Sequence, residues 1–397
     1  MKLYVNGLLY AISYALDCIE RELVGVSTGH SKRVAYICAV MGKSLELNDM
    51  QLTELSACAI MHDSALTEFL TKEYGGNINL IEQINLSSHC IMGERNISKL
   101  PFSSNIKNAV LYHHENADGS GPFGKAASET PLYAQLIHFG DILDVNCNFG
   151  AQETDKYVKV FKFIDDNAGT IFDDKLCTLF KSLFDKNMIE DLQKKDLIVN
   201  LEKVVPKEYV EYSKDKIIEI MNVFARIIDY KSKFTKNHSI GVAQKALLMG
   251  EFYGYDDDKC CQLYIAGILH DIGKMAIKNE ILEKPGSLTD DEFTIMKNHA
   301  LFTYNILSEI NGSKNIASWA ASHHEKLDGT GYPFGKKAEE LDHEDRLLAC
   351  IDIYQALSEE RPYKKGFTHE KCIEIMKDMV KSGFVDGQIV EDIEEVF

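Results

Sequence analysis

The feature that most constrains the fold of this chain is an internal repeat of histidine and aspartate motifs. The segment STGHSKRVA at 27–35 recurs as TKNHSIGVA at 235–243, 208 residues further along the chain. Further landmarks repeat at offsets of 208 to 211 residues, namely His62-Asp63 with His270-Asp271, His89 with His299, His113-His114 with His323-His324, and Asp141 with Asp352. A nearly constant offset over five landmarks predicts two copies of one domain in tandem.

The distribution of apolar residues indicates what kind of domain is repeated. Apolar side chains recur at three- and four-residue spacing in the stretches 8–19 and 217–228, which is the period of an amphipathic helix. Only seven prolines occur in 397 residues, and the sequence contains no series of alternating strands separated by hairpin turns. We therefore expect an all-α fold, with a first domain at 1–185, a helical linker packed between the lobes at 186–212, and a second domain at 213–397.

Composition and charge exclude several classes of partner. The net charge of −18 argues against binding to a nucleic acid polymer or an anionic membrane. No stretch reaches the roughly 18 apolar residues of a membrane span, and no secretory signal surrounds the apolar run at 8–16. Ten scattered cysteines without a Cys-x-x-Cys pair suit a reducing compartment. We expect a cytoplasmic protein that binds a small ligand, and the sequence leaves a homodimer open.

The histidines concentrate at the repeated landmarks. Ten of the thirteen stand at matched positions, five in each half. A lone His-Asp pair would be interpreted as a buried hydrogen bond, but five imidazoles and two carboxylates in one half suit two ions sharing a carboxylate and a water. Such a set fits iron, manganese, nickel or zinc, and two close ions predict hydrolysis of a phosphate ester. The candidate ligands of the second half are His238, His270, Asp271, His299, His323, His324 and Asp352.

Four strings of the second half resemble the HD-GYP family of bacterial cyclic-dinucleotide phosphodiesterases, a branch of the HD metal-dependent phosphohydrolases. They are HDIGK at 270–274, HHEKLDGTGYP at 323–333, ACIDIYQAL at 349–357 and RPYKK at 361–365. The resemblance implies an all-α HD fold and a site with two or three metal ions, commonly iron or manganese. It also implies hydrolysis of the second messenger cyclic di-GMP to the linear dinucleotide by attack of a metal-bridging hydroxide.

Other functions are open at this point. Within the same family, the alternative is a phosphodiesterase for 3′,3′-cyclic GMP-AMP. Outside it, the alternatives are a non-catalytic protein that senses nucleotide or metal, and a nucleotide phosphohydrolase of the broader HD class.

The resemblance also implies roles for individual residues. The seven candidate ligands match the metal ligands of the family, with Asp271 bridging two ions and acting in catalysis together with a lysine that contacts the scissile phosphate. Taken alone, the tyrosine of the loop could be a simple anchor, and the two basic residues after it could be a solvated surface pair. The substrate-binding residues implied by the match are Lys274, Gly331, Tyr332, Arg361 and Lys364.

Two positions depart from the family pattern. Phe234 stands four residues before the first ligand histidine, where members with three metals have Glu. We therefore expect two divalent ions, iron or manganese, in the second domain. Gln355 stands three residues after Asp352, where many members have Asp, and this difference leaves the base preference open.

The first half keeps a complete ligand set but lacks the groups that would hold a dinucleotide. Leu66 stands at the position of Lys274, no tyrosine separates Gly121 from Pro122, and nothing like RPYKK follows. We expect this half to bind metal without hydrolysing a cyclic dinucleotide, and to pack against or gate the second half. The alternatives are a duplicate whose histidines only form hydrogen bonds, and activity on another small phosphate. Its candidate ligands are His30, His62, Asp63, His89, His113, His114 and Asp141.

Overall fold

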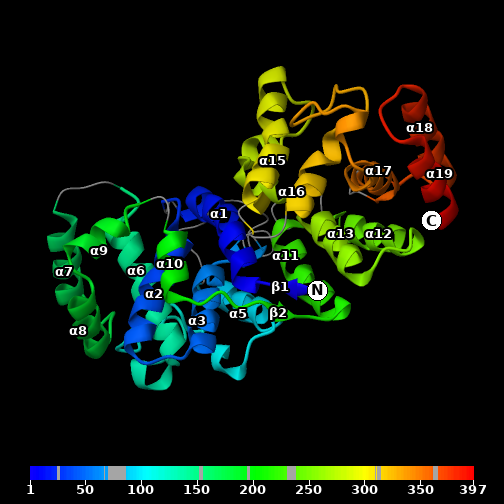
Figure 1. Ribbon diagram of the computed structural model, residues 1–397. Helices are drawn as coiled ribbons and strands as arrows, with labels where there is room; N and C mark the ends of the chain where they lie inside the picture. Colours follow the sequence, from blue (N-terminus) through cyan, green and yellow to red (C-terminus); the bar gives the residue numbers. More distant parts are fainter. Residues whose placement is uncertain are drawn as a thin grey trace. The chain divides into compact units, whose positions relative to one another are not determined.

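The computed structural model is almost entirely helical over the residues that it describes (Figure 1). These residues divide into two compact units, Tyr4–Val210 and Met1–Leu3 together with Glu211–Phe397. Phe234, Arg361 and Lys364 lie outside the described residues. The described ranges are 1–24, 27–66, 68–69, 86–151, 155–194, 197–229, 238–308, 310, 314–360 and 365–397.

The first unit is built around helix α2, which packs against α1, α3, α6 and α10. Helices α7 and α8 pack against each other, and α7 also packs against α6 and α9. In chain order the helices are α1 (Val5–Val24), α2 (His30–Ser44), α3 (Asp49–Met61), α5 (Leu86–Ile97), α6 (Leu132–Cys147), α7 (Lys156–Asn167), α8 (Asp174–Leu183), α9 (Lys186–Asp191) and α10 (Ile198–Val204). Short 3₁₀ turns are η2 (Ser104–Ile106) and η3 (Ala127–Glu129).

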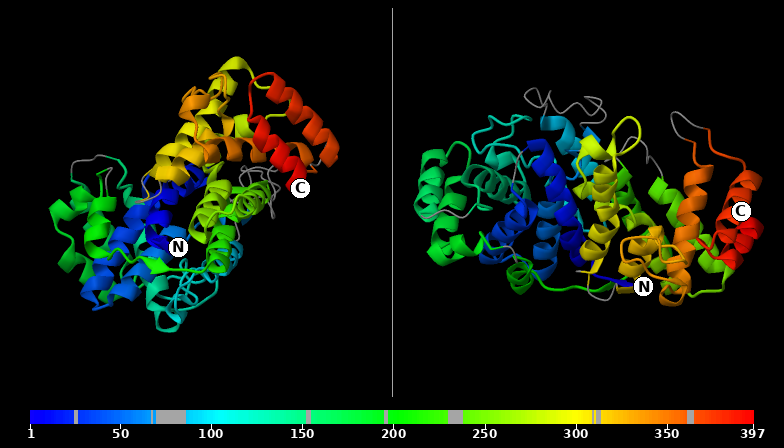
Figure 2. Two further views of the ribbon diagram at one scale, coloured as in Figure 1. Left: turned by 45° about the vertical axis from the view of Figure 1, so that its right-hand side comes forward. Right: turned by 90° about the horizontal axis from the view of Figure 1, so that it is seen from above.

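The second unit is built around α12 and α13, which pack against each other and against α11. Near the C-terminus, α18 packs against both α17 and α19 (Figure 2). A two-stranded sheet joins β1 (Lys2–Leu3) to β2 (Val210–Glu211). The helices are α11 (Lys214–Asp229), α12 (His238–Phe252), α13 (Asp257–Leu269), α14 (Asn279–Leu282), α15 (Asp290–Ser308), α16 (Lys314–Ala321), α17 (His343–Ser358), α18 (His369–Lys381) and α19 (Gly387–Val396), with 3₁₀ turns η4 (Ile272–Ala276), η5 (Ser322–His324) and η6 (Ala338–Glu340).

The same succession of helices occurs in both units. Helices α2, α3, α5 and α6 of the first unit correspond in order and motif content to α12, α13, α15 and α17 of the second. Helix α2 packs against α3 and α6, and in the same way α12 packs against α13 and α17. The predicted duplication and the tandem all-α fold are therefore confirmed. The predicted apolar stripes are confirmed too, because Leu8 and Ile12 in α1 and Ile217 and Phe224 in α11 are buried.

Helices α3 and α13 explain why a His-Asp pair stands at the same point of each unit. Asn48 and Asp256 begin them, each accepting a backbone N–H with its side chain, as good N-cap residues do. Both helices then run through a buried apolar stretch. The residue after the last turn is His62 in one unit and His270 in the other, and both are buried. Because each helix is buried along its apolar stretch, the His-Asp pair that follows it also lies in the interior.

The stretch expected to be a linker, 186–212, contains α9, α10 and β2. The part up to Val210 belongs to the first unit, where α10 packs against α2. Among the described helices, none is long and apolar enough to span a bilayer.

Candidate metal centres

Three histidines of the second unit are each held in one tautomer by a backbone carbonyl group. The Nδ1 atoms of His270, His299 and His323 lie 2.8, 2.7 and 2.6 Å from the carbonyl oxygens three residues before them. A carbonyl can only accept a hydrogen bond, so each Nδ1 carries the proton and each Nε2 presents a lone pair. Such a backbone contact is the usual way to orient a metal-binding imidazole.

These lone pairs converge on one another and on carboxylates. The Nε2 atoms of His299 and His323 are 3.3 Å apart, and His270 Nε2 lies 3.2 Å from Asp271 Oδ2. Burial lowers the pKa of His299 to about 3 and also lowers that of His323, which favours neutral rings. His270 Nε2 and Asp271 Oδ1 are buried and have no hydrogen-bond partner among the described residues. Acceptors facing acceptors in a dry interior are costly unless a cation lies between them, so the donor set fits divalent ions.

All seven candidate ligands of the second unit meet in this centre. They fall into three overlapping groups whose ligand atoms lie within 4.8 Å of one another. The groups are His238, His270 and Asp352; His270, Asp271 and His323; and His299, His323 and His324. Because His270 and His323 each belong to two groups, the seven side chains form one continuous cluster.

His238 is held differently from the other histidines. Its Nδ1 lies 3.1 Å from Glu359 Oε2 and its Nε2 lies 3.1 Å from Asp352 Oδ1. Burial lowers the pKa of His238, but the bonds to the two carboxylates outweigh burial and raise it to about 10. Burial raises the pKa of Asp352, yet the bond from His238 holds it well below its usual range. A cation bound by Asp352 and His238 would displace the Nε2 proton, while Glu359 would keep the ring in place.

Lys274 lies at the edge of the centre, as the HDIGK string predicts. Its Nζ is 2.5 Å from Asp271 Oδ2, and about a quarter of the side chain is exposed. Burial raises the pKa of Asp271, but Lys274 and His270 outweigh this and hold the pKa well below its usual range. The glycine of the string allows this turn to approach α15, because a Cβ on Gly273 would lie 2.0 Å from the carbonyl oxygen of His299.

The glycine-rich loop brings Tyr332 to the centre. The ring of Tyr332 lies 4.7 Å from that of His324, centroid to centroid, at 38°. A Cβ on Gly331 would lie 2.5 Å from Glu325 Cα, so only glycine fits there. Glu325 accepts the backbone N–H groups of residues 334–336 and holds the loop against η5. The substrate residues predicted at Arg361 and Lys364 lie outside the described residues.

The first unit repeats the arrangement. His62 and His113 donate from Nδ1 to carbonyl oxygens at 2.8 and 2.6 Å, and Asp63 Oδ1 lies 3.3 Å from His89 Nε2. Leu66, at the position of Lys274, is buried. Six of the seven first-half candidates fall into two groups, and one group includes a residue that the sequence analysis did not single out, Cys90. The seventh candidate, Asp63, belongs to neither group, but its Oδ1 lies 3.4 Å from His113 Nε2. The groups are His30, His62 and Asp141, and His89, Cys90, His113 and His114.

The residues that orient the first ligand differ between the units. His30 Nδ1 lies 2.7 Å from Asp144 Oδ2, and Arg33 donates to the same carboxylate at 2.6 Å. At the corresponding positions the second unit has Gln355 and Gly241. Gln355 accepts instead from Lys245 Nζ at 2.7 Å. The loss of this carboxylate explains why His238 depends on Glu359.

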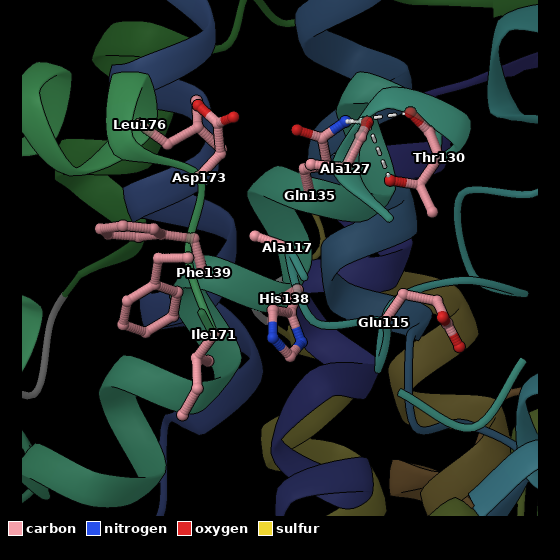
Figure 3. Close-up of a pocket in the computed structure, with 11 residues that line it drawn as sticks. Glu115, Ala117, Ala127, Thr130, Gln135, His138, Phe139, Ile171, Asp173 and Leu176 are labelled. Atoms are coloured by element: carbon pink, nitrogen blue, oxygen red, sulfur yellow. Dashed lines mark hydrogen bonds between the residues drawn. The ribbon is translucent and has the colours of Figure 1, made fainter. Parts of the chain in front are cut away.

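A small pocket in the first unit lies apart from the ligand groups (Figure 3). His138 lines it and donates from Nδ1 to the carbonyl oxygen of His113 at 3.0 Å, which links the pocket to a candidate ligand. Gln135 bonds to the carbonyl oxygens of Ala127 and Thr130 at its rim. The lining residues are Glu115, Ala117, Ala127, Thr130, Gln135, His138, Phe139, Ile171, Phe172, Asp173 and Leu176.

Comparisons with known proteins agree with the duplicated helical fold. The family model described as HD domain matches residues 18–176 and 222–389. The 3′3′-cGAMP-specific phosphodiesterase 1 of Vibrio cholerae is 27% identical over 96% of this chain and 90% of that protein. A cyclic di-GMP phosphodiesterase of Thermotoga maritima is 33% identical over 46% of this chain and 49% of that protein. In fold, the chain is similar to the crystal structure of a cyclic GMP-AMP-specific phosphodiesterase of Vibrio cholerae, with a TM-score of 0.70, 23% identity, and coverage of 100% of this chain and 98% of that one.

Proposed function

Because the chain belongs to the HD domain family, whose model it matches twice, we propose that its second unit is a phosphodiesterase that hydrolyses a cyclic dinucleotide. The catalytic domain in this proposal is 213–397. The observation that carries it is the convergence of seven nitrogen and oxygen ligands beside Lys274 and Tyr332. A phosphodiester with flanking bases needs both kinds of group, cations for the phosphate and a flat surface for a base.

The ligands of the proposed enzyme are the seven histidines and aspartates of the second-unit centre. They contain no thiolate, which suits iron or manganese. Asp271, whose two oxygens lie 3.2 Å from His270 Nε2 and 3.5 Å from His299 Nε2, would be the carboxylate shared by two ions. When bound, two divalent ions supply an activated water and a clamp on phosphoryl oxygens.

Lys274 contributes the positive charge of the chain itself. Its Nζ lies beside Asp271 and is partly exposed, so the ammonium can turn toward a phosphate oxygen. One P–O bond of the ring breaks, water oxygen joins phosphorus, and the leaving oxygen takes a proton. The ammonium group would stabilise the negative charge that develops on the phosphoryl oxygens.

Tyr332 contributes a stacking face for one base. Its ring is half-buried and leans on His324, so its orientation is set before substrate binds. Stacking of a base on an aromatic ring tolerates any base. Arg361 and Lys364 are proposed to hold the remaining phosphate and base edge, as their match to the family implies.

Two observations favour 3′,3′-cyclic GMP-AMP over cyclic di-GMP as the substrate. The relatives that match nearly the whole chain, the 3′3′-cGAMP-specific phosphodiesterases 1 and 3 of Vibrio cholerae, are named for the former. Gln355 stands near the centre in place of the Asp of many family members and is held by Lys245. An amide can donate to a base edge where a carboxylate cannot.

None of the ten cysteines forms a disulfide, in keeping with a cytoplasmic site of action.

The test is a substrate panel with the purified full chain. The protein is loaded anaerobically with Mn²⁺ or Fe²⁺ and incubated with cyclic GMP-AMP, cyclic di-GMP or deoxynucleoside triphosphates, and products are separated by chromatography. Linear dinucleotide from cyclic GMP-AMP, faster than from cyclic di-GMP, supports the proposal. Binding without turnover would instead favour a sensor, and cleavage of the triphosphates alone would favour a nucleotide phosphohydrolase.

A further inference from the structure

We propose that the first unit contains a thiolate-ligated zinc site built from His89, Cys90, His113 and His114. This site differs in kind from the thiolate-free centre of the second unit. The inference concerns a different part of the chain from the proposed function and does not depend on it.

The spacing of the four ligand atoms suits a tetrahedral site. The four ligand atoms all lie within 4.8 Å of one another. His89 Nε2 is 3.1 Å from His114 Nε2 and 3.7 Å from Cys90 Sγ. A tetrahedron with Zn–N of about 2.0–2.1 Å and Zn–S of about 2.3 Å has ligand-to-ligand edges of roughly 3.3–3.7 Å. Small shifts of these side chains would complete it.

The buried ring of His113 also favours a cation at this group. His113 is fully buried and donates from Nδ1 to the carbonyl oxygen of Val110. Its Nε2 is buried as well, and it has no hydrogen-bond partner among the described residues. Asp63 Oδ1 lies 3.4 Å from this atom. An ion bound by this group would give the buried Nε2 a partner.

The duplication supplies an internal comparison. The group of the second unit that corresponds to this one contains His299, His323 and His324. The residue after His299, where the first unit has Cys90, is Ala300. The two units thus offer imidazoles at corresponding positions, and the first unit adds a soft ligand. Thiolate favours zinc over the harder ions that suit a purely nitrogen and oxygen set.

Four protein ligands around one ion leave no position for substrate, which is the mark of a structural zinc site. This agrees with the other changes in the first unit. Leu66 replaces the lysine at the edge of the centre, and no tyrosine follows Gly121. The first unit would then use its metal to hold α5 to the segment that carries His113 and His114.

The test is Co²⁺ substitution of the full chain, with absorption spectroscopy as the readout. A thiolate ligand gives an intense sulfur-to-Co²⁺ charge-transfer band in the near ultraviolet, which imidazole and carboxylate do not give. We expect this band in the wild-type protein and its loss in Cys90→Ser. The control is Cys58→Ser, an equally buried cysteine of the same unit that belongs to none of the metal groups found among the described residues.

Zinc content of the protein gives a second readout. The wild type should retain about one zinc ion per chain after mild chelation, as expected for a closed site, and Cys90→Ser should lose it. A folded, Co²⁺-loaded wild type without the band would overturn the proposal, whether or not the variant folds. A band that persists in Cys90→Ser, or that disappears equally in Cys58→Ser, would also overturn it.

Discussion

Glu359 accepts a hydrogen bond from the Nδ1 of His238 at 3.1 Å, and it does in the second unit what Asp144 does for His30 in the first. The two carboxylates stand at different positions of the repeat, since Asp144 corresponds to Gln355. The orienting contact has been kept while the residue that makes it has changed.

Glu359→Ala should therefore weaken metal binding at the second centre without removing a ligand. Loss of a carboxylate that orients a metal-bound histidine typically costs about 10–100-fold in metal affinity. A Mn²⁺ titration of activity should move to higher concentration by that factor and recover at saturation. Glu360→Ala, an exposed neighbour, is the control. Identical titrations for the two variants would show that Glu359 does not act on the metal.

Lys274→Ala should lower turnover while leaving metal content near that of the wild type. Removal of one fixed positive partner of a transition-state oxygen costs about 10²–10³-fold in kcat. Lys278→Ala, an exposed lysine on the following turn, should have little effect. If Lys274→Ala turns over normally, the lysine serves only as the ion-pair partner of Asp271.

Tyr332→Ala should raise KM more than it lowers kcat, because stacking on a base acts on ground and transition states alike. The contact is worth about 1–3 kcal/mol, so a rise of about 5–150-fold in KM is expected from steady-state kinetics. Tyr332→Phe keeps the ring and should stay close to the wild type. A fall in kcat at unchanged KM in the alanine variant would place the tyrosine in the chemical step instead.

Gly331→Ala should disturb the loop itself, since the added Cβ would lie 2.4 Å from the backbone N of Lys326. The matched change in the first unit is Gly121→Ala, where a Cβ would lie 2.6 Å from Glu115 Cα. We expect kcat/KM to fall for the first variant and to hold for the second, although both lose stability on thermal unfolding. Equal losses of activity would mean that both loops serve the reaction.

The sequence was sufficient for the parts of the molecule that repeat. Five landmarks at a nearly constant offset predicted the two units, and the histidines and aspartates at those landmarks predicted both sets of candidate ligands. What could not be predicted depends on contacts across the fold. Glu359 follows the last turn of α17 and reaches His238 across the fold. Glu325 bonds to the loop because Gly331 has no side chain, which allows the loop backbone to lie against residues 324–326. Cys90 carried no motif, because its neighbour His89 was the repeated residue.

The most direct test of the central claim compares two double variants in hydrolysis of cyclic GMP-AMP, measured as linear product by chromatography. His270→Ala/Asp271→Ala removes ligands of the second-unit centre, and His62→Ala/Asp63→Ala removes their counterparts in the first unit. With folding checked by circular dichroism and metal content measured, we expect the first variant to lose turnover and the second to retain it. If the first-unit variant lost all hydrolysis while it stayed folded and kept its second-unit metals, or if the second-unit variant still turned over, the assignment of catalysis to the second unit would be wrong.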